Sequence, residues 1–140
     1  MPKNTKNHPA SPALFLLFNH RLTRVQETDA RASLGIRQIV APPEAVQHLW
    51  SAVPPEAESL GEYLAPVVAW LAAQARPGDF VLIQGEFGAT CALVSEAFRL
   101  GLAPVYSTTR REAVEEHDAD NGRVHIRHTF SHVRYRKYEP

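Results

Sequence analysis

The feature that most constrains the fold is an alternation of short apolar runs with helical segments. Residues 13–18, Ala-Leu-Phe-Leu-Leu-Phe, form a continuous apolar run of the kind found in strands buried on both faces. Residues 80–83 form a shorter run of the same type, and further strands are expected at residues 36–40 and 104–107. Because helical segments separate them, the strands are expected to be joined by right-handed crossovers. The sequence therefore predicts an α/β fold with a mainly parallel sheet flanked by helices.

The segments between the strands carry signals for helix ends. Thr23 and Gln26 have the spacing of a capping box, which predicts a helix that begins there and stops near Gly35. Residues 43–75 have a helical pattern, in which Pro66 is expected to kink the helix or to mark its first turn. A further helix is expected between residues 90 and 101.

The chain of 140 residues has the usual size of one domain. Residues 1–12 are rich in Lys, Asn and Pro and are predicted to be a disordered leader, so one folded domain is expected over residues 13–138. The longest apolar stretch near the start is far too short for a membrane span. The single cysteine, Cys91, excludes an internal disulfide and fits a reducing compartment. We expect a soluble, cytoplasmic protein. Three side chains are expected in the core: Cys91, Trp50 and Trp70.

Charge is balanced overall but unevenly distributed. The chain has 15 Lys and Arg against 15 Asp and Glu, so the net charge indicates no particular partner. An acidic stretch over residues 112–120 is followed by a basic segment over residues 123–137. In that segment Val124, Ile126 and Phe130 alternate with polar residues, which predicts a half-exposed strand at the sheet edge.

Polar residues follow the expected strands at the edge where open α/β sheets bind ligands. Glycines there allow close backbone approach, and amides at a helix start attract phosphate. The sequence therefore predicts an anion-binding, nucleotide-binding crevice. The expected strand ends supply Asn19, His20, Gln84, Gly85, Thr108, Thr109 and Arg110, and the following helix start supplies Gly88, Ala89 and Thr90.

Each of these segments also has an explanation without a ligand. The glycines of residues 84–90 would equally allow a tight strand-to-helix turn. The carboxylate of Glu86 would repel an anion bound in that loop. Arg110 and Arg111 would equally lie in a solvated polar loop. The basic C-terminal segment would equally protect an edge strand against aggregation. The histidines lack the spacing of metal ligands, so no metal site is expected.

Four segments together resemble a known family. Residues 18–20, 83–90, 105–110 and 130–138 are similar to the blocks of a small Csx-type CRISPR-associated family encoded with type III systems. The resemblance covers residues 13–138, nearly the whole expected domain. It implies a Rossmann-like (CARF-like) ring nuclease that binds and cuts cyclic oligoadenylate, typically cyclic tetra-adenylate, and so switches off antiviral signalling. It also implies a homodimer.

Metal-free cleavage of such a ring would use the ribose 2′-hydroxyl as nucleophile and leave a 2′,3′-cyclic phosphate. We predict that His132 acts as acid or base and that Arg110 and Arg134 bind the phosphate. Arg136 and the strand-end residues would bind the ligand, with no cofactor. The alternatives are a non-catalytic binder that sequesters the same messenger, and a regulator whose basic segment binds long nucleic acid. The latter would need an effector domain for which the chain has no room, so no long nucleic acid is expected.

Overall fold

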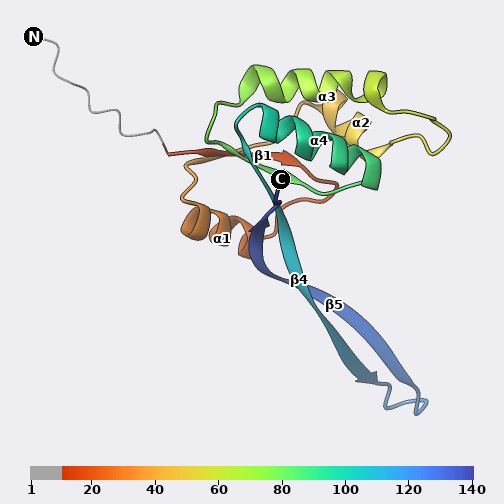
Figure 1. Ribbon diagram of the computed structural model, residues 1–140. Helices are drawn as coiled ribbons and strands as arrows, with labels where there is room; N and C mark the ends of the chain where they lie inside the picture. Colours follow the sequence, from red (N-terminus) through yellow and green to blue (C-terminus); the bar gives the residue numbers. More distant parts are fainter. Residues whose placement is uncertain (1–10) are drawn as a thin grey trace, which may run out of the picture.

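The computed structural model describes residues 11–140, which form one five-stranded sheet with helices on both faces (Figure 1). Of the predicted leader, residues 1–10 lie outside the described residues. The elements in chain order are β1 (Ala13–Leu17), α1 (Arg24–Leu34), β2 (Gln38–Val40), α2 (Glu44–Ser51), α3 (Gly61–Gln74), β3 (Phe80–Ile83), α4 (Phe87–Arg99), β4 (Ala103–His117) and β5 (Val124–Lys137).

The strand order is β2-β1-β3-β4-β5, with parallel pairs from β2 to β4 and an antiparallel β5 at the edge. This confirms the predicted α/β fold, its mainly parallel sheet and the edge position of the last strand. After β1 the chain passes to β2 on one side, whereas after β3 it passes to β4 on the other. The strand order therefore reverses between β1 and β3, and their carboxyl ends mark the place where such sheets bind ligands.

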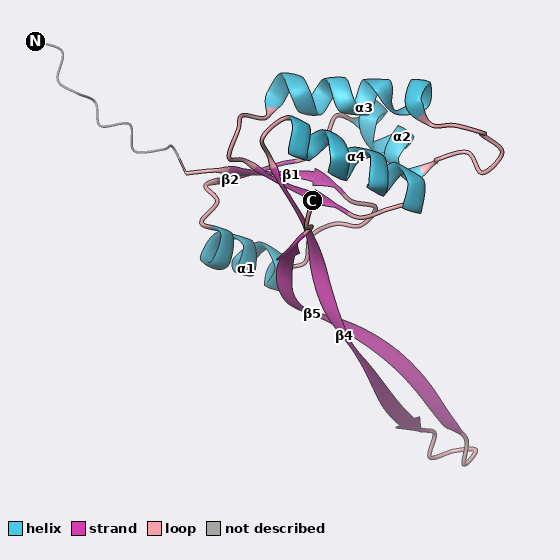
Figure 2. Cartoon of the chain, in the orientation of Figure 1, coloured by secondary structure: helices cyan, strands magenta, loops and turns pink. Residues whose placement is uncertain are grey.

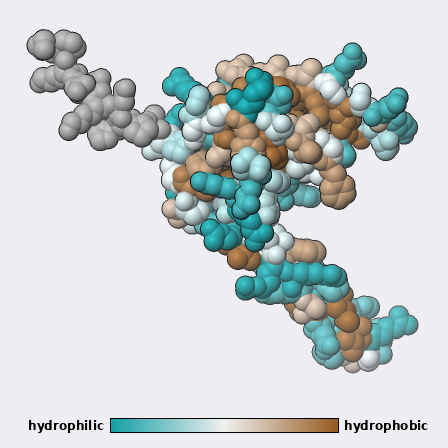
Figure 3. Space-filling model, viewed as in Figure 1, coloured by the Kyte–Doolittle hydropathy of each residue, from teal (hydrophilic) through white to brown (hydrophobic). Residues whose placement is uncertain are grey.

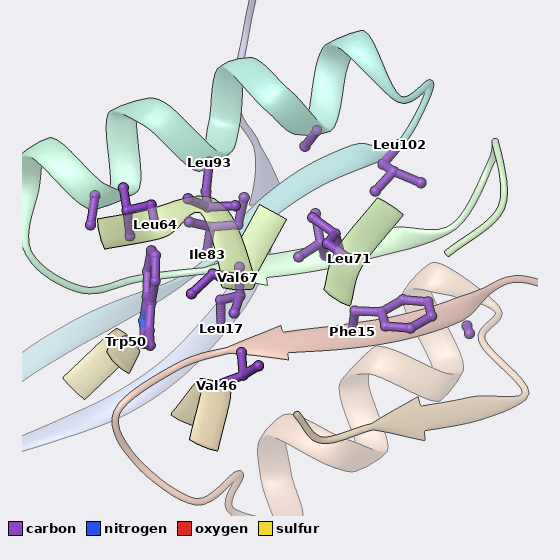
Figure 4. Packing of buried hydrophobic residues seen from close by; sticks show 14 residues of the cluster. Phe15, Leu17, Val46, Trp50, Leu64, Val67, Leu71, Ile83, Leu93 and Leu102 are labelled. Atoms are coloured by element: carbon purple, nitrogen blue, oxygen red, sulfur yellow. The ribbon is translucent and has the colours of Figure 1, made fainter. Parts of the chain in front are cut away.

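Side chains of the central strands alternate between two apolar layers. Phe15, Leu17 and Ile83 belong to the layer beneath α2, α3 and α4, which surrounds Trp50 (Figure 4). Leu14 and Leu82 belong to the layer covered by α1. The predicted core position of Trp50 is confirmed, since the residue is 1% exposed. Trp70 lies at the edge of the same layer, partly buried, with its ring edge-on to that of Phe15.

The core position predicted for Cys91 is wrong. Cys91 is exposed, and the buried residues of α4 are Ala89, Leu93 and Ala97. Successive helical residues are rotated by about 100°, so a residue two positions from both Ala89 and Leu93 points away from the face they share. Small residues at that face let the helix lie close to the sheet.

Residues 43–75 are mostly helical, as predicted, but they do not form one continuous helix. Two helices occupy this segment, and the connection between them contains Pro54 and Pro55. Adjacent prolines remove backbone donors and disfavour helix at the residue before each of them, which explains the interruption. Pro66 lies in α3 beyond its first turn.

The fourth strand is longer than predicted. It pairs with β3 only over Ala103–Val105 but with β5 as far as His117, through the acidic stretch. The two strands therefore project from the sheet as a hairpin (Figure 2), and we call residues 109–132 the arm. The acidic stretch of β4 lies beside the basic segment of β5, and the Glu116 carboxylate is 3.4 Å from Arg127 Nε. The basic segment is thus paired with negative charge from its own hairpin.

The end of α1 offers a test of local backbone strain. The capping box predicted at Thr23 and Gln26 is present, and Gly35 follows the helix with a φ of 65°. A Cβ at Gly35 would meet no atom within 4 Å, so only the left-handed backbone opposes a side chain there. We expect Gly35→Ala to lower the free energy of unfolding by about 1 kcal/mol. Gly61→Ala, which is equally unobstructed but has no positive φ, should not destabilise the protein in the same urea titration.

Candidate functional site

A cavity of about 560 Å³ lies where the carboxyl ends of β1, β3 and the sheet part of β4 meet the start of α1 and the base of the arm. It occupies the position expected from the reversal of strand order. Its volume is within the range of small-molecule sites, roughly 300–1,000 Å³. The cavity is lined by Phe18, His20, Arg21, Thr23, Val25, Gln26, Gln84, Ser107, Thr109, Phe130, Ser131 and His132.

Three side chains from three elements form a hydrogen-bonded chain beside this cavity. His132 Nε2 lies 2.6 Å from Asp29 Oδ2, and His132 Nδ1 lies 2.6 Å from Ser107 Oγ. The imidazole is 3% exposed, whereas the carboxylate of Asp29 is 29% exposed. Because a carboxylate can only accept, the tautomer that fits has Nε2 donating to Asp29 and Nδ1 accepting from the Ser107 hydroxyl. Such a chain orients an imidazole to take a proton from a hydroxyl.

Two glutamines fix Ser107 in this chain. Gln84 Oε1 accepts a 2.7 Å hydrogen bond from the Ser107 amide, and Gln26 Nε2 donates to Ser107 Oγ at 3.3 Å. Gln26 can do this because its Oε1 already accepts from the Thr23 amide in the capping box. The same residue therefore begins α1 and holds the serine. A bulge at Thr108/Thr109 follows directly and turns the strand outward into the arm.

Tyr135 attaches the histidine strand to α1. Its hydroxyl donates to the Gln26 carbonyl at 2.9 Å, and its ring lies 4.7 Å from that of His132. Burial, and secondarily the charge of Asp29, raise the pKa of Tyr135 to about 12. This hydrogen bond joins β5 to α1 beside the Asp29–His132 contact.

The structure brings together some of the predicted site residues and not others. His20, Gln84, Thr109 and His132 line the cavity. Asn19 is exposed next to it, and the Thr108 hydroxyl donates to the Arg134 carbonyl. Sequence reasoning did not identify Arg21, Gln26, Asp29 or Ser107 as site residues.

The predicted cations lie elsewhere. Arg110 is exposed on the arm and does not line the cavity, whereas its neighbour Thr109 lines it. Arg134 and Arg136 line a second hollow of about 720 Å³ near the C-terminus, which shares Asp29 with the first site. The guanidinium of Arg136 donates to the Tyr106 hydroxyl at 2.9 Å. The arginine that lines the strand-end cavity is instead Arg21, and His20 lines it too.

The loop over residues 84–90 serves packing and capping. A Cβ on Gly85 would lie 2.8 Å from Trp50 Nε1, so glycine is required there by the core. The expectation of free amides at the start of α4 is wrong, because the Glu86 carboxylate accepts from Gly88 N at 2.9 Å and from Ala89 N at 3.0 Å. The Thr90 hydroxyl is buried and makes no hydrogen bond with the described residues. The predicted binding residues Gly85, Gly88, Ala89 and Thr90 do not line the cavity.

The Glu86 cap predicts a pH dependence of stability. Hydrogen bonds from the Gly88 and Ala89 amides lower the pKa of Glu86 below its ordinary 4.5. The folded state therefore binds this proton less readily than the unfolded state, so the stabilisation is complete above pH 4.5 and is lost as the pH falls through the folded-state pKa. We expect the stability difference between wild type and Glu86→Gln to be largest at neutral pH and to shrink in acid. Urea titrations at several pH values measure it, and Glu86→Asp should retain the cap.

Within the described residues no group of three His, Cys, Asp or Glu side chains is placed to hold a metal ion. Among the helices of residues 11–140, none combines the length and apolar character needed to cross a membrane.

Comparison with known proteins identifies the family. The model of the "Uncharacterized protein MJ1673 family" matches residues 12–136. "Uncharacterized protein MJ1673" of Methanocaldococcus jannaschii is 42% identical over 129 residues, which cover 92% of this chain and 98% of that protein. No solved structure matches. The matched residues run from the start of β1 past His132, the last residue that lines the cavity. The chain therefore belongs to the uncharacterized protein MJ1673 family.

Proposed function

We propose that this protein is a ring nuclease that binds cyclic oligoadenylate, cyclic tetra-adenylate in particular, and cleaves it to linear products without a metal ion. Such an activity would switch off type III CRISPR antiviral signalling. The observation that supports it most is the Asp29–His132–Ser107 chain at the strand-end cavity. The resemblance of residues 13–138 to Rossmann-like, CARF-like ring nucleases supplies the substrate class.

The proposed chemistry is a proton transfer coupled to in-line attack. The ribose 2′-hydroxyl attacks the adjacent phosphorus, and the bond from phosphorus to the 5′-oxygen breaks as that oxygen takes a proton from water. The products are a 2′,3′-cyclic phosphate and a 5′-hydroxyl. Both ring nitrogens of His132 already have partners, so the imidazole would accept the 2′-hydroxyl proton through Ser107 Oγ, which lines the same cavity. Hydrogen bonding of Nε2 to Asp29 stabilises the imidazolium that forms.

Other cavity residues would hold the ligand. Arg21 offers a guanidinium to a phosphate, and the His20 ring offers a further hydrogen-bonding nitrogen. The rings of Phe18 and Phe130 offer apolar surface for an adenine.

A second candidate, sequestration without cleavage, is favoured by one observation. His132 is 3% exposed and has hydrogen-bond partners on both nitrogens, as a purely structural histidine would. A binder would use the same cavity and the same ligand-binding side chains. The two candidates differ only in whether the ring is opened.

Binding can be tested separately from cleavage. We expect Arg21→Ala to weaken the binding of cyclic tetra-adenylate by about tenfold or more, since it removes a charge-assisted phosphate contact. Arg110→Ala is the matched control, because that arginine does not line the cavity. Calorimetric titration of both variants at one salt concentration measures the effect. Equal losses for the two variants would place the phosphate away from the strand-end cavity.

A further inference from the structure

The arm exposes an apolar stripe that the described residues do not cover. Val124, Ile126 and Phe130 are 51%, 61% and 66% exposed, and hydrophobic atoms lie among hydrophilic ones along the projecting hairpin (Figure 3). A two-stranded hairpin is marginally stable by itself in water. A hairpin that leaves the sheet with its apolar side chains exposed is therefore expected to pack against another surface.

The pairing of the strands shows which face carries this stripe. Opposed residues of an antiparallel pair point to the same face, and alternate residues along each strand share that face. Thr109 lies opposite His132, and both line the cavity. Moving outward from the cavity, the same face carries four more opposed pairs. They are Arg111 with Phe130, Ala113 with His128, Glu115 with Ile126, and His117 with Val124. The apolar stripe is thus continuous with the cavity wall.

This face is complementary to itself. Ala113 and His128 are directly opposed, and they form the centre of the pattern. On β4, Arg111 and Glu115 lie two positions to either side of Ala113. On β5, Phe130 and Ile126 lie two positions to either side of His128. Consider two arms packed face to face, related by a two-fold axis through this centre. The axis lies in the plane between the arms and runs perpendicular to the strands. It places each arginine opposite a glutamate of the other copy, and each phenylalanine opposite an isoleucine.

We infer that the arm is a dimerisation element whose partner is a second copy of this chain. The two arms cross face to face and run in opposite directions about that axis. The small side chain of Ala113 at the centre allows the sheets to approach to the usual ~10 Å. Arg111 pairs with the partner's Glu115, and Phe130 packs on the partner's Ile126.

This arrangement makes the strand-end cavity a shared site. The same two-fold operation places His117 opposite the partner's Thr109 and Val124 opposite the partner's His132. The tip of each arm then covers the cavity of the other copy and contributes His117 to its rim. The inference rests on the arm's charge and apolar pattern and does not depend on the proposed activity, so either can fail alone.

Charge reversal tests the pairing. Sedimentation equilibrium of the full chain is expected to show a dimer. Arg111→Glu and Glu115→Arg should each weaken the dimer by about tenfold, because each replaces two symmetry-related attractions by repulsions. The double variant R111E/E115R exchanges the charges and should restore the dissociation constant to within about threefold of wild type. Circular dichroism confirms that each variant is folded. A wild-type monomer, or a double variant weaker than both single ones, would overturn the inference.

Cross-linking tests the axis. In a Cys91→Ser background, Ala113→Cys should give a covalent dimer with a short bismaleimide, because the two thiols lie across the axis. Val114→Cys, whose side chain points to the opposite face of the same strand, is the control and should give little product. Equal yields would exclude this face as the contact. Binding of a long RNA to the arm of a monomer would likewise overturn the inference in favour of a nucleic-acid surface.

Discussion

Replacing His132 by glutamine is expected to lower the turnover of cyclic tetra-adenylate by about 10²–10⁴-fold, the contribution of a general acid or base. The substitution removes the only imidazole in hydrogen-bond contact with Ser107 Oγ among the described residues. Glutamine retains polar atoms that can reach Asp29 or Ser107, so the structural loss should be smaller than for alanine. Single-turnover assays with saturating enzyme measure the chemical step separately from binding.

The matched control for His132 is His125→Gln. His125 lies on the arm opposite Glu116, away from the cavity face, and this variant should retain wild-type turnover. Asp29→Asn should give an intermediate loss, because it removes the negative charge that stabilises an imidazolium. If His132→Gln turned over as wild type does while remaining folded, the histidine would have no part in the chemistry.

Truncating Trp50 is expected to cause the largest loss of stability. The residue is 1% exposed, it packs against Gly85, and its indole Nε1 donates to the Gln84 carbonyl at 3.1 Å. Trp50→Ala should lower the free energy of unfolding by about 3–5 kcal/mol, since it leaves a cavity and an unpaired carbonyl. Because Gln84 holds the Ser107 amide, the same variant should also weaken ligand binding.

Two variants separate the contributions to this loss. Trp50→Phe keeps most of the apolar volume but not the indole N–H, so it should cost less than half as much. Trp70→Ala removes a partly buried ring from the edge of the same layer and should also cost less than Trp50→Ala. Urea titrations with an unchanged m-value provide the comparison. Equal losses for Trp50→Ala and Trp70→Ala would contradict the central role of Trp50 in the core.

The positions of the buried strands could largely be predicted from the sequence. The apolar runs at residues 13–18 and 80–83 are buried strands, and the capping box at Thr23 begins a helix as expected. The length of β4 could not be predicted, because residues 112–117 include three glutamates and acquire their strand pairing from β5, seven or more positions further along the chain. The exposure of Cys91 was missed because the helix packs through small alanines, which leave a weak apolar signal.

Four of the twelve cavity-lining residues were predicted: His20, Gln84 and Thr109 from their positions after strands, and His132 from the basic C-terminal segment. Asp29 and Ser107 could not be predicted, since a carboxylate in a helix and a serine at a strand end are common and carry no motif. Asp29 does lie one turn after Gln26, on the same face of α1, which is the signal that links them. The role of Glu86 also required the structure, because only its conformation shows that it caps its own helix.

The central claim is tested most directly by incubating the purified protein with cyclic tetra-adenylate in excess EDTA and resolving the products by chromatography and mass. We predict multiple turnover to linear adenylates that end in 2′,3′-cyclic phosphate. A ring that remains intact and co-elutes with the protein would contradict cleavage and support sequestration. A ring that is neither bound nor cut, with metal restored and across ring sizes, would contradict the proposed function as a whole.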